Sequence, residues 1–265
     1  MRGLPGSPWP EKGKTGSDAG LEDQFGELDM LIDRVHECPV CSVKFSIKEV
    51  KVGKASSDGM DLDLRTRYRN LDANKYKVVE CPRCGYADML KYFGKLNKRE
   101  IAALKEKNIG RGREEMAEEC ARSYSDAYDS YKAALRCNLI RGAKSSRRAH
   151  TALYSAWLLR GWRESMEKAG MSADGLEMSE DEERKLIKYA LKNLKNAEMT
   201  EDFPINDMSE PIFDYLMAAL SYEQGELDDA GRYVLRALQN KILKGVVRPM
   251  AEDLREMIKQ DRKKA

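Results

Sequence analysis

The sequence lacks the features that usually identify a membrane protein, an exported protein or an enzyme of a common class. It has no run of about 18 or more apolar residues, so we expect no membrane span. Its first ten residues contain no apolar core of the kind that a secretory signal has. It has only two histidines and no P-loop, Gly-x-Gly-x-x-Gly or nucleophile-elbow motif. We therefore expect a non-enzymatic protein with no catalytic residues and no membrane contact.

The overall composition indicates a folded, largely helical chain without a strong preference for charged partners. Charged residues make up 35% and hydrophobic residues 42% of the chain. The net charge of +2 gives no general attraction to nucleic acid or to a membrane surface. Lysine and arginine outnumber Asp and Glu between residues 34 and 99. This mild basic bias is compatible with an acidic partner and is also common on solvated faces.

Two short cysteine motifs, which we call the knuckles, are the most specific feature of the sequence. They read Cys38-Pro39-Val40-Cys41 and Cys81-Pro82-Arg83-Cys84. In each, a tight turn can direct two thiolates at one ion, and four thiolates suit tetrahedral Zn²⁺. Gly85 favours the turn after the second knuckle, whereas Ser42 takes the corresponding place after the first. The predicted metal ligands are Cys38, Cys41, Cys81 and Cys84.

The pattern favours structural zinc over the other uses of paired cysteines. Four thiolates leave no open coordination position, so the metal is expected to stabilise the fold and not to catalyse. A redox dithiol needs only one such motif, normally beside a βαβ pattern that is absent here. Disulfides are disfavoured because no secretory segment is seen, and reduced cysteines favour a cytoplasmic location. Rubredoxin-like iron uses the same ligands and stays open as an alternative to zinc.

The segment around the knuckles has strand-like patterning. Apolar residues alternate over residues 43–52, and residues 75–80 predict a second strand that leads into the second knuckle. A turn is expected at residues 56–59, and helical spacing over residues 21–35 predicts a short helix before the first knuckle. This order is typical of a zinc ribbon. With so few apolar residues, metal binding should supply much of its folding free energy, on the order of 10 kcal/mol.

Downstream, the sequence predicts helices separated by glycine- or proline-containing turns. Asn97 and Glu100 predict a capping box, Ser179 and Glu182 predict another, and Pro211 suits a first helical turn. The expected helices span residues 97–104, 114–139, 146–169, 180–198, 211–224, 228–240 and 249–263. We divide the chain into a disordered tail (1–20), a zinc-ribbon-like module with flanking helices (21–110) and an α-helical domain (111–265).

The two helices around Gly225 resemble a tetratricopeptide (TPR) helix pair. Small residues at Ala218, Ala230 and Ala237 occur where such a pair needs close packing. Similar Tyr and Ala-Leu patterns end earlier helices, at intervals longer and less regular than about 34 residues. The predicted fold class is thus α+β, predominantly α, with a small zinc-ribbon-like β module followed by a degenerate TPR-like antiparallel helical array. Its concave face would bind a protein or peptide partner.

A set of short elements accompanies the knuckles in a fixed order. They are Phe45, Arg67-Tyr68-Arg69-Asn70-Leu71-Asp72, Tyr76, Gly85-Tyr86-Ala87, Leu139-Ile140-Arg141-Gly142, Ala156-Trp157-Leu158-Leu159-Arg160 and the Gly225 repeat. With them, roughly residues 30–260 resemble the bacterial domain-of-unknown-function family 2225. The resemblance implies zinc knuckles followed by TPR-like helices, and it implies no activity. Residues 61–64 stand where family members often carry an extra polar or cysteine-containing stretch, so we infer no fifth ligand.

The other chemistry-bearing residues have ordinary structural explanations. His36 could support the metal site from nearby, whereas His150, Cys120 and Cys137 are expected to pack on helices. The basic run at residues 141–148 is expected to be a solvated loop. Cations and aromatics interleave over residues 65–77, a mix that suits single-stranded nucleic acid or a thin core. The cluster of Tyr154, Trp157, Leu158 and Trp162 predicts core packing.

The sequence therefore favours a cytoplasmic zinc-binding scaffold or adaptor whose helices bind a protein or peptide. The alternative is a nucleic-acid-binding or regulatory protein that uses the basic face of the zinc-ribbon-like module. A redox sensor built on the knuckles is a third, less favoured hypothesis. The sequence does not specify the partner or the oligomeric state.

Overall fold

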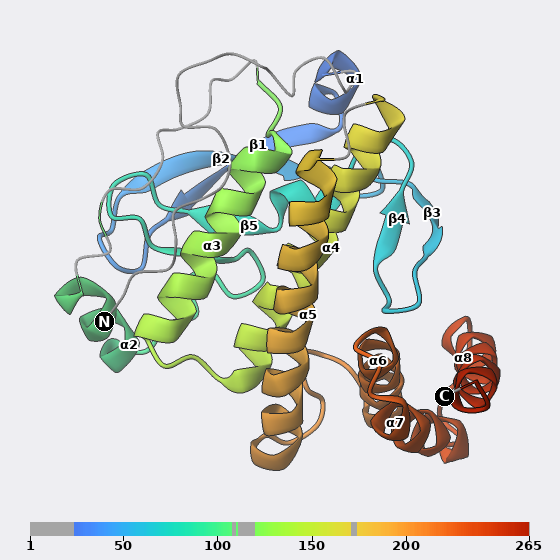
Figure 1. Ribbon diagram of the computed structural model, residues 1–265. Coiled ribbons are helices and arrows are strands. Elements are labelled where there is room, and N and C mark those ends of the chain that lie inside the picture. The colour runs from blue at the N-terminus through green and yellow to red at the C-terminus, as the bar shows by residue number, and fades with distance from the viewer. Residues whose placement is uncertain (1–23, 108–109, 111–119, 171–173, 265) are drawn as a thin grey trace.

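A computed structural model describes residues 24–107, 110, 120–170 and 174–264, and it has strands near the N-terminus and helices beyond them (Figure 1). The strands form three antiparallel pairs: β1 (Leu31–Glu37) with β2 (Lys44–Val50), β3 (Ser57–Met60) with β4 (Thr66–Tyr68), and β5 (Val78–Glu80) with β6 (Ala87–Met89). The helices are α1 (Gln24–Leu28), the 3₁₀ helix η2 (Ala73–Tyr76), α2 (Lys98–Glu106), α3 (Tyr124–Ile140), α4 (Ser145–Lys168), α5 (Asp174–Thr200), α6 (Glu210–Glu223), α7 (Leu227–Gln239) and α8 (Val247–Arg262). This confirms the predicted fold class.

The segment before the first knuckle differs from its prediction. The expected helix over residues 21–35 ends at Leu28, and the chain then pairs with β2 as strand β1. Leu31 is buried, but Val35 is 74% exposed, so the helical spacing of these apolar residues does not correspond to one buried face. Backbone pairing with β2 decides the conformation here, because it satisfies the backbone hydrogen bonds along the facing edges of the two strands.

Two short features between the knuckles also differ. The expected turn at residues 56–59 lies mostly within β3, which pairs with β4. Residues 75–80 form a strand only from Val78, because the Asp72 side chain accepts a hydrogen bond from the Asn74 amide and caps η2. Asp72 also lies against α4, where a Cβ on Gly161 would come within 2.4 Å of its Oδ2. Glycine therefore permits the close approach of α4 to η2.

Most helix predictions agree with the structure within two residues. The capping box of Asn97 and Glu100 is present, and Pro211 lies in the first turn of α6. Residues 120–123 are not helical, so α3 begins at Tyr124, later than expected; residues 114–119 lie outside the described residues. The predicted cap at Ser179 is wrong, because α5 begins at Asp174 and Ser179 lies buried within it.

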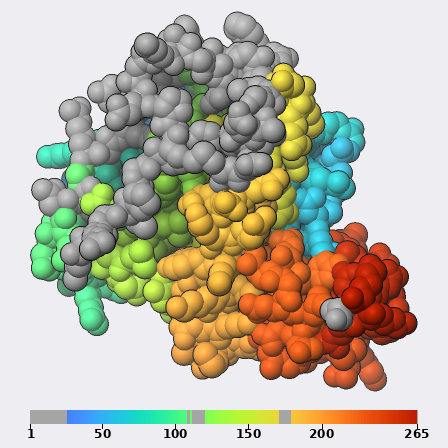
Figure 2. Space-filling model, in the orientation of Figure 1, coloured from blue at the N-terminus to red at the C-terminus, as the bar shows by residue number. Residues whose placement is uncertain are grey.

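The largest hydrophobic core joins the helices to the hairpin of β5 and β6. It includes Val78, Ala87 and Met89 from the hairpin, and it buries Trp157 and Trp162 as predicted for core packing. Helix α3 lies against this hairpin, and α4 packs beside α5 (Figure 1). In the space-filling view, α5, α6, α7 and α8 form one continuous surface at the lower right (Figure 2). The predicted tail (1–20) lies outside the described residues, and the predicted boundary at residue 110 stays a prediction.

Candidate metal centre

The structure brings the four knuckle cysteines to one point. All four Sγ atoms lie within 4.8 Å of one another, although the knuckles are far apart in sequence. Cys38 Sγ lies 3.6 Å from Cys84 Sγ, and Cys41 Sγ lies 3.6 Å from Cys81 Sγ. Four sulfurs bound tetrahedrally at about 2.3 Å from an ion would be about 3.8 Å apart. The spacing therefore fits a tetrahedral metal ion, and all six cysteines of the chain are free of disulfides.

The two knuckles have the same backbone geometry. The amide of Ser42 donates to the Cys38 carbonyl at 2.8 Å, and the amide of Gly85 donates to the Cys81 carbonyl at 3.0 Å. Ser42 and Gly85 both have left-handed backbone angles, with φ of 60° and 67°. A side chain at such an angle costs about 1–2 kcal/mol. The turn at Ser42 is therefore strained, whereas glycine makes the same turn without strain in the second knuckle.

Aromatic side chains enclose the cysteine cluster on the protein side. The ring of Phe93 stacks on Tyr86 at 5.1 Å and meets Phe45 edge-on at 6.1 Å. Cys38 and Cys81 are buried, whereas Cys41 and Cys84 are half-buried. With all four ligands supplied by the protein, a bound ion would hold β1, β2, β5 and β6 together and would have no open position for a substrate.

The pKa values of Cys81 and Cys84 are shifted in opposite directions. The hydrogen bond from Cys38 and the nearby Cys84 lower the pKa of Cys81, so that its thiolate is favoured. The hydrogen bonds that involve Cys38 and then Cys81 raise the pKa of Cys84, and its burial raises it further. Several thiolates at this distance repel one another, and a divalent cation would remove that repulsion. The donor set thus suits a soft or borderline metal cation.

Arg141 links this centre to the helices, which the sequence did not reveal. Its side chain is fully buried and donates to Asp88 at 2.8 Å and to Glu100 at 2.9 Å. Asp88 also accepts from the hydroxyl of Tyr86, two residues after Cys84. Arg141 was expected in a solvated loop, and that expectation is wrong for this residue. No sequence motif identifies the pair, because Asp88 and Arg141 meet only through the packing of α3 on β6.

The remaining cysteines and histidines are placed as follows. His36 contacts Glu49 at 2.7 Å, and its ring packs edge-on against Phe93. Cys137 is buried as expected, and its sulfur accepts the Ala87 amide at 3.4 Å directly beneath the second knuckle. Cys120 differs from its prediction, because it is exposed and precedes α3. His150 lies in α4 away from the cysteines and is discussed below.

The basic residues between the knuckles are largely engaged within the protein. Arg65 is buried and forms a two-pronged contact with Glu164, with both distances 2.7 Å. Lys75 is buried against Glu27 at 2.8 Å, and the exposed Arg69 pairs with Asp58. These acidic partners neutralise much of the positive charge that would attract a nucleic acid.

A second charged cluster attaches the β3–β4 hairpin to α4. Arg160 contacts Asp63 at 3.1 Å and Glu183 at 2.6 Å, and the indole of Trp157 donates to Asp63 at 2.7 Å. Glu223 lies 3.5 Å from Arg160. Burial, followed by the charge of Asp63, raises the pKa of Glu223 to about 8. No sequence motif indicates this cluster, because its members come from four separate segments of the chain.

None of the helices in the described part of the chain is long and apolar enough to cross a membrane.

The fold and the cysteine cluster define a protein in which a β module with four convergent cysteines, close enough together to hold a metal ion, is joined to a helical array. A family model described as "Uncharacterized protein conserved in bacteria (DUF2225)" matches residues 31–265, and the chain therefore belongs to this family. The resemblance that the sequence elements suggested is confirmed. No curated protein and no solved structure shows a significant match.

Proposed function

We propose that the protein is a non-enzymatic zinc-binding scaffold that acts in the reducing cytoplasm. The observation that carries this proposal is the convergence of four free cysteine sulfurs within 4.8 Å. A closed set of four sulfur ligands is typical of structural zinc, and thiols of this kind stay reduced in the cytoplasm. Iron in the same ligands is the alternative. The metal would stabilise the β module and the face of α3 that packs on it.

Metal analysis of protein purified without oxygen tests the zinc assignment. We expect one zinc per chain, no visible absorption and little thiol reactivity. Iron at the same stoichiometry, in a coloured protein, would instead support the rubredoxin-like alternative. Chelation of the metal should increase hydrogen exchange in β1, β2, β5 and β6 while the α4–α5 pair stays protected, because helical residues form most of the core that buries this pair. Unchanged exchange in the β module after complete metal removal would contradict a structural role.

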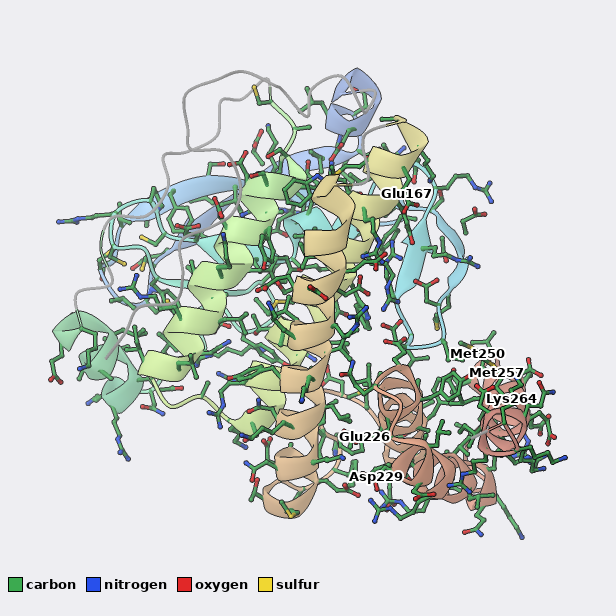
Figure 3. All side chains as sticks on the ribbon, viewed as in Figure 1. Glu167, Glu226, Asp229, Met250, Met257 and Lys264 are labelled. Carbon is green, nitrogen blue, oxygen red and sulfur yellow. The ribbon has the colours of Figure 1, made fainter. Side chains whose placement is uncertain are left out.

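We further propose that the C-terminal helices are TPR-like and bind a peptide or partner helix. Ala218, Ala230 and Ala237 are fully buried where α6 packs on α7, and Gly225 makes the turn between them with φ of 76°. Lys195 of α5 binds both Glu226 and Asp229 at the start of α7, the two acidic residues labelled beside α6 in Figure 3. These contacts support a stacked helical scaffold.

Apolar side chains on α8 and the preceding loop support the adaptor role. Ile242 and Val246 are 70% and 68% exposed, and Met257 of α8 is 39% exposed (Figure 3). Affinity purification from the native host should recover a specific partner with the wild-type chain. Ile242→Lys with Val246→Lys should remove that partner. Val52→Lys, at a still more exposed position in the β module, should retain it. Absence of any specific partner would refute the adaptor role.

A further inference from the structure

A cavity separate from the cysteine cluster lies between the β3–β4 hairpin, η2 and the helices. Its volume is about 220 Å³, and its walls come from β4, η2, α4, α5 and α6. An apolar protein cavity of about 150 Å³ is large enough to bind benzene. The cavity can therefore hold an organic molecule somewhat larger than one aromatic ring. Nothing in the proposed zinc or adaptor function uses it.

Two nitrogen-bearing side chains, Lys77 and His150, line this cavity from different elements. Lys77 lines it, and burial lowers the pKa of its ammonium group, which has no hydrogen bond or ion pair to the described residues. His150 lines it from α4, and its Nδ1 is buried without a hydrogen-bond partner in the described part of the chain. Burial lowers the pKa of His150 to about 3, so its ring is neutral at physiological pH. Buried polar groups in proteins are nearly always paired, so the buried Nδ1 of His150 calls for a ligand, and the half-buried Lys77 lines the same cavity.

The rest of the wall is mainly apolar and carries no carboxylate. Leu153, Trp157, Ile212 and Leu216 supply aliphatic and aromatic surface, and no Asp or Glu lies among the lining residues. A positive charge next to such a wall favours an anion with an apolar body. Lys77 is the only Lys or Arg among the described lining residues. Phosphate sites usually offer several donors, such as a helix N-terminus or arginines, so a carboxylate suits this cavity better.

We propose that this cavity binds a small carboxylic acid with a flat apolar or aromatic body. The carboxylate would pair with Lys77, the neutral His150 ring would supply a hydrogen bond, and the apolar body would lie against Trp157 and Leu153. Because the walls come from both the β3–β4 hairpin and the helices, the ligand would bridge the two parts of the protein. Binding would then raise the thermal stability of the whole chain.

Calorimetric titration of the zinc-loaded full chain with benzoate and with benzamide tests the proposal. The two probes have nearly the same shape and differ in charge. We expect benzoate to bind about tenfold more tightly, the difference that one charge-assisted hydrogen bond provides. Lys77→Met keeps the length of the side chain and should abolish the preference. Lys192→Met makes the same change at an exposed position of α5 outside the cavity, and it should retain the preference.

Leu216→Trp provides a second variant, because it fills the cavity and should remove binding of both probes. Near-UV circular dichroism establishes that each variant is folded. Three outcomes would overturn the proposal: no saturable binding of either probe at millimolar concentration, equal affinity for both probes in the wild-type chain, or an unchanged benzoate affinity in folded Lys77→Met. The wild-type comparison alone decides the matter if a variant fails to fold.

Discussion

Replacing Arg141 with methionine tests how the metal-binding module is attached to the helices. The side chains of Arg141 and Asp88 have 0% exposure, and the arginine also binds Glu100 and Asn138. Methionine keeps most of the volume but leaves the Asp88 carboxylate buried without its cation. Breaking a buried ion pair on one side costs about 3–5 kcal/mol. We expect a decrease of that size in the free energy of unfolding near neutral pH.

The cost should depend on pH in a defined direction. Burial already raises the pKa of Asp88, and the charge of Arg141 opposes that effect. Without Arg141 the folded-state pKa of Asp88 rises further, while its unfolded-state value stays near 3.8. A group with a raised folded-state pKa contributes stability below its unfolded pKa and loses it as the pH rises through the folded pKa. The variant should therefore be less destabilised at pH 5 than at pH 8.

Urea denaturation in the presence of zinc, followed by far-UV circular dichroism, measures these changes. Arg136→Met is the matched control, because Arg136 lies exposed on the same helix and should change stability by less than about 0.5 kcal/mol. Asp88→Asn combined with Arg141→Met should cost clearly less than the sum of the two single changes. The reasoning would be refuted by equal effects of Arg141→Met and Arg136→Met, or by strictly additive effects in the double variant.

Three further changes follow from local geometry. Ser42→Gly relieves a left-handed backbone angle and should raise the free energy of unfolding in urea by about 0.5–1 kcal/mol, and a loss of stability would contradict the strain. Gly161→Ala should destabilise the protein by about 1–3 kcal/mol, because its Cβ would meet the Asp72 carboxylate. Gly231→Ala should be nearly neutral, because its Cβ would meet only the end of the exposed Arg262 side chain. Similar melting temperatures for the two variants would disprove this reasoning. Glu223 has its pKa raised from 4.5 to about 8, so the wild-type chain should lose stability as the pH rises between these values. Glu223→Gln should therefore be more stable than wild type at pH 9, by about 1–3 kcal/mol in thermal unfolding, and a destabilised variant there would show that the sign is wrong.

Features that depend on neighbouring residues in the chain were predictable from the sequence. The capping box at Asn97 and the turn proline at Pro211 follow from backbone hydrogen bonds within a single helical turn. The long helices α4, α6 and α7 were predicted close to their actual bounds. The convergence of the knuckles could also be anticipated, because four thiolates in two tight turns suit the ligation of one metal ion.

Features that depend on distant contacts were not predictable. Residues 31–35 have helical spacing, yet they form β1 because β2 pairs with their backbone along one edge. Ser179 resembles a helix cap, yet α5 continues through it, packed beside α4, and its hydroxyl donates to the Leu159 carbonyl of α4. Propensity is a weak preference that tertiary contacts override.

The sequence by itself determined that this chain has two cysteine knuckles, reduced thiols and a helical C-terminal part. These properties depend on residue type and short spacing, which are fixed before folding. Only the tertiary structure decided the roles of charged residues, as Arg141 and Lys77 show. Arg141 lies in a run that was expected to be solvated, yet it is buried against Asp88. Lys77 ends a stretch of mixed cations and aromatics, and it lines a cavity. The free energy of a charge depends on its burial and its partners, and packing alone determines these.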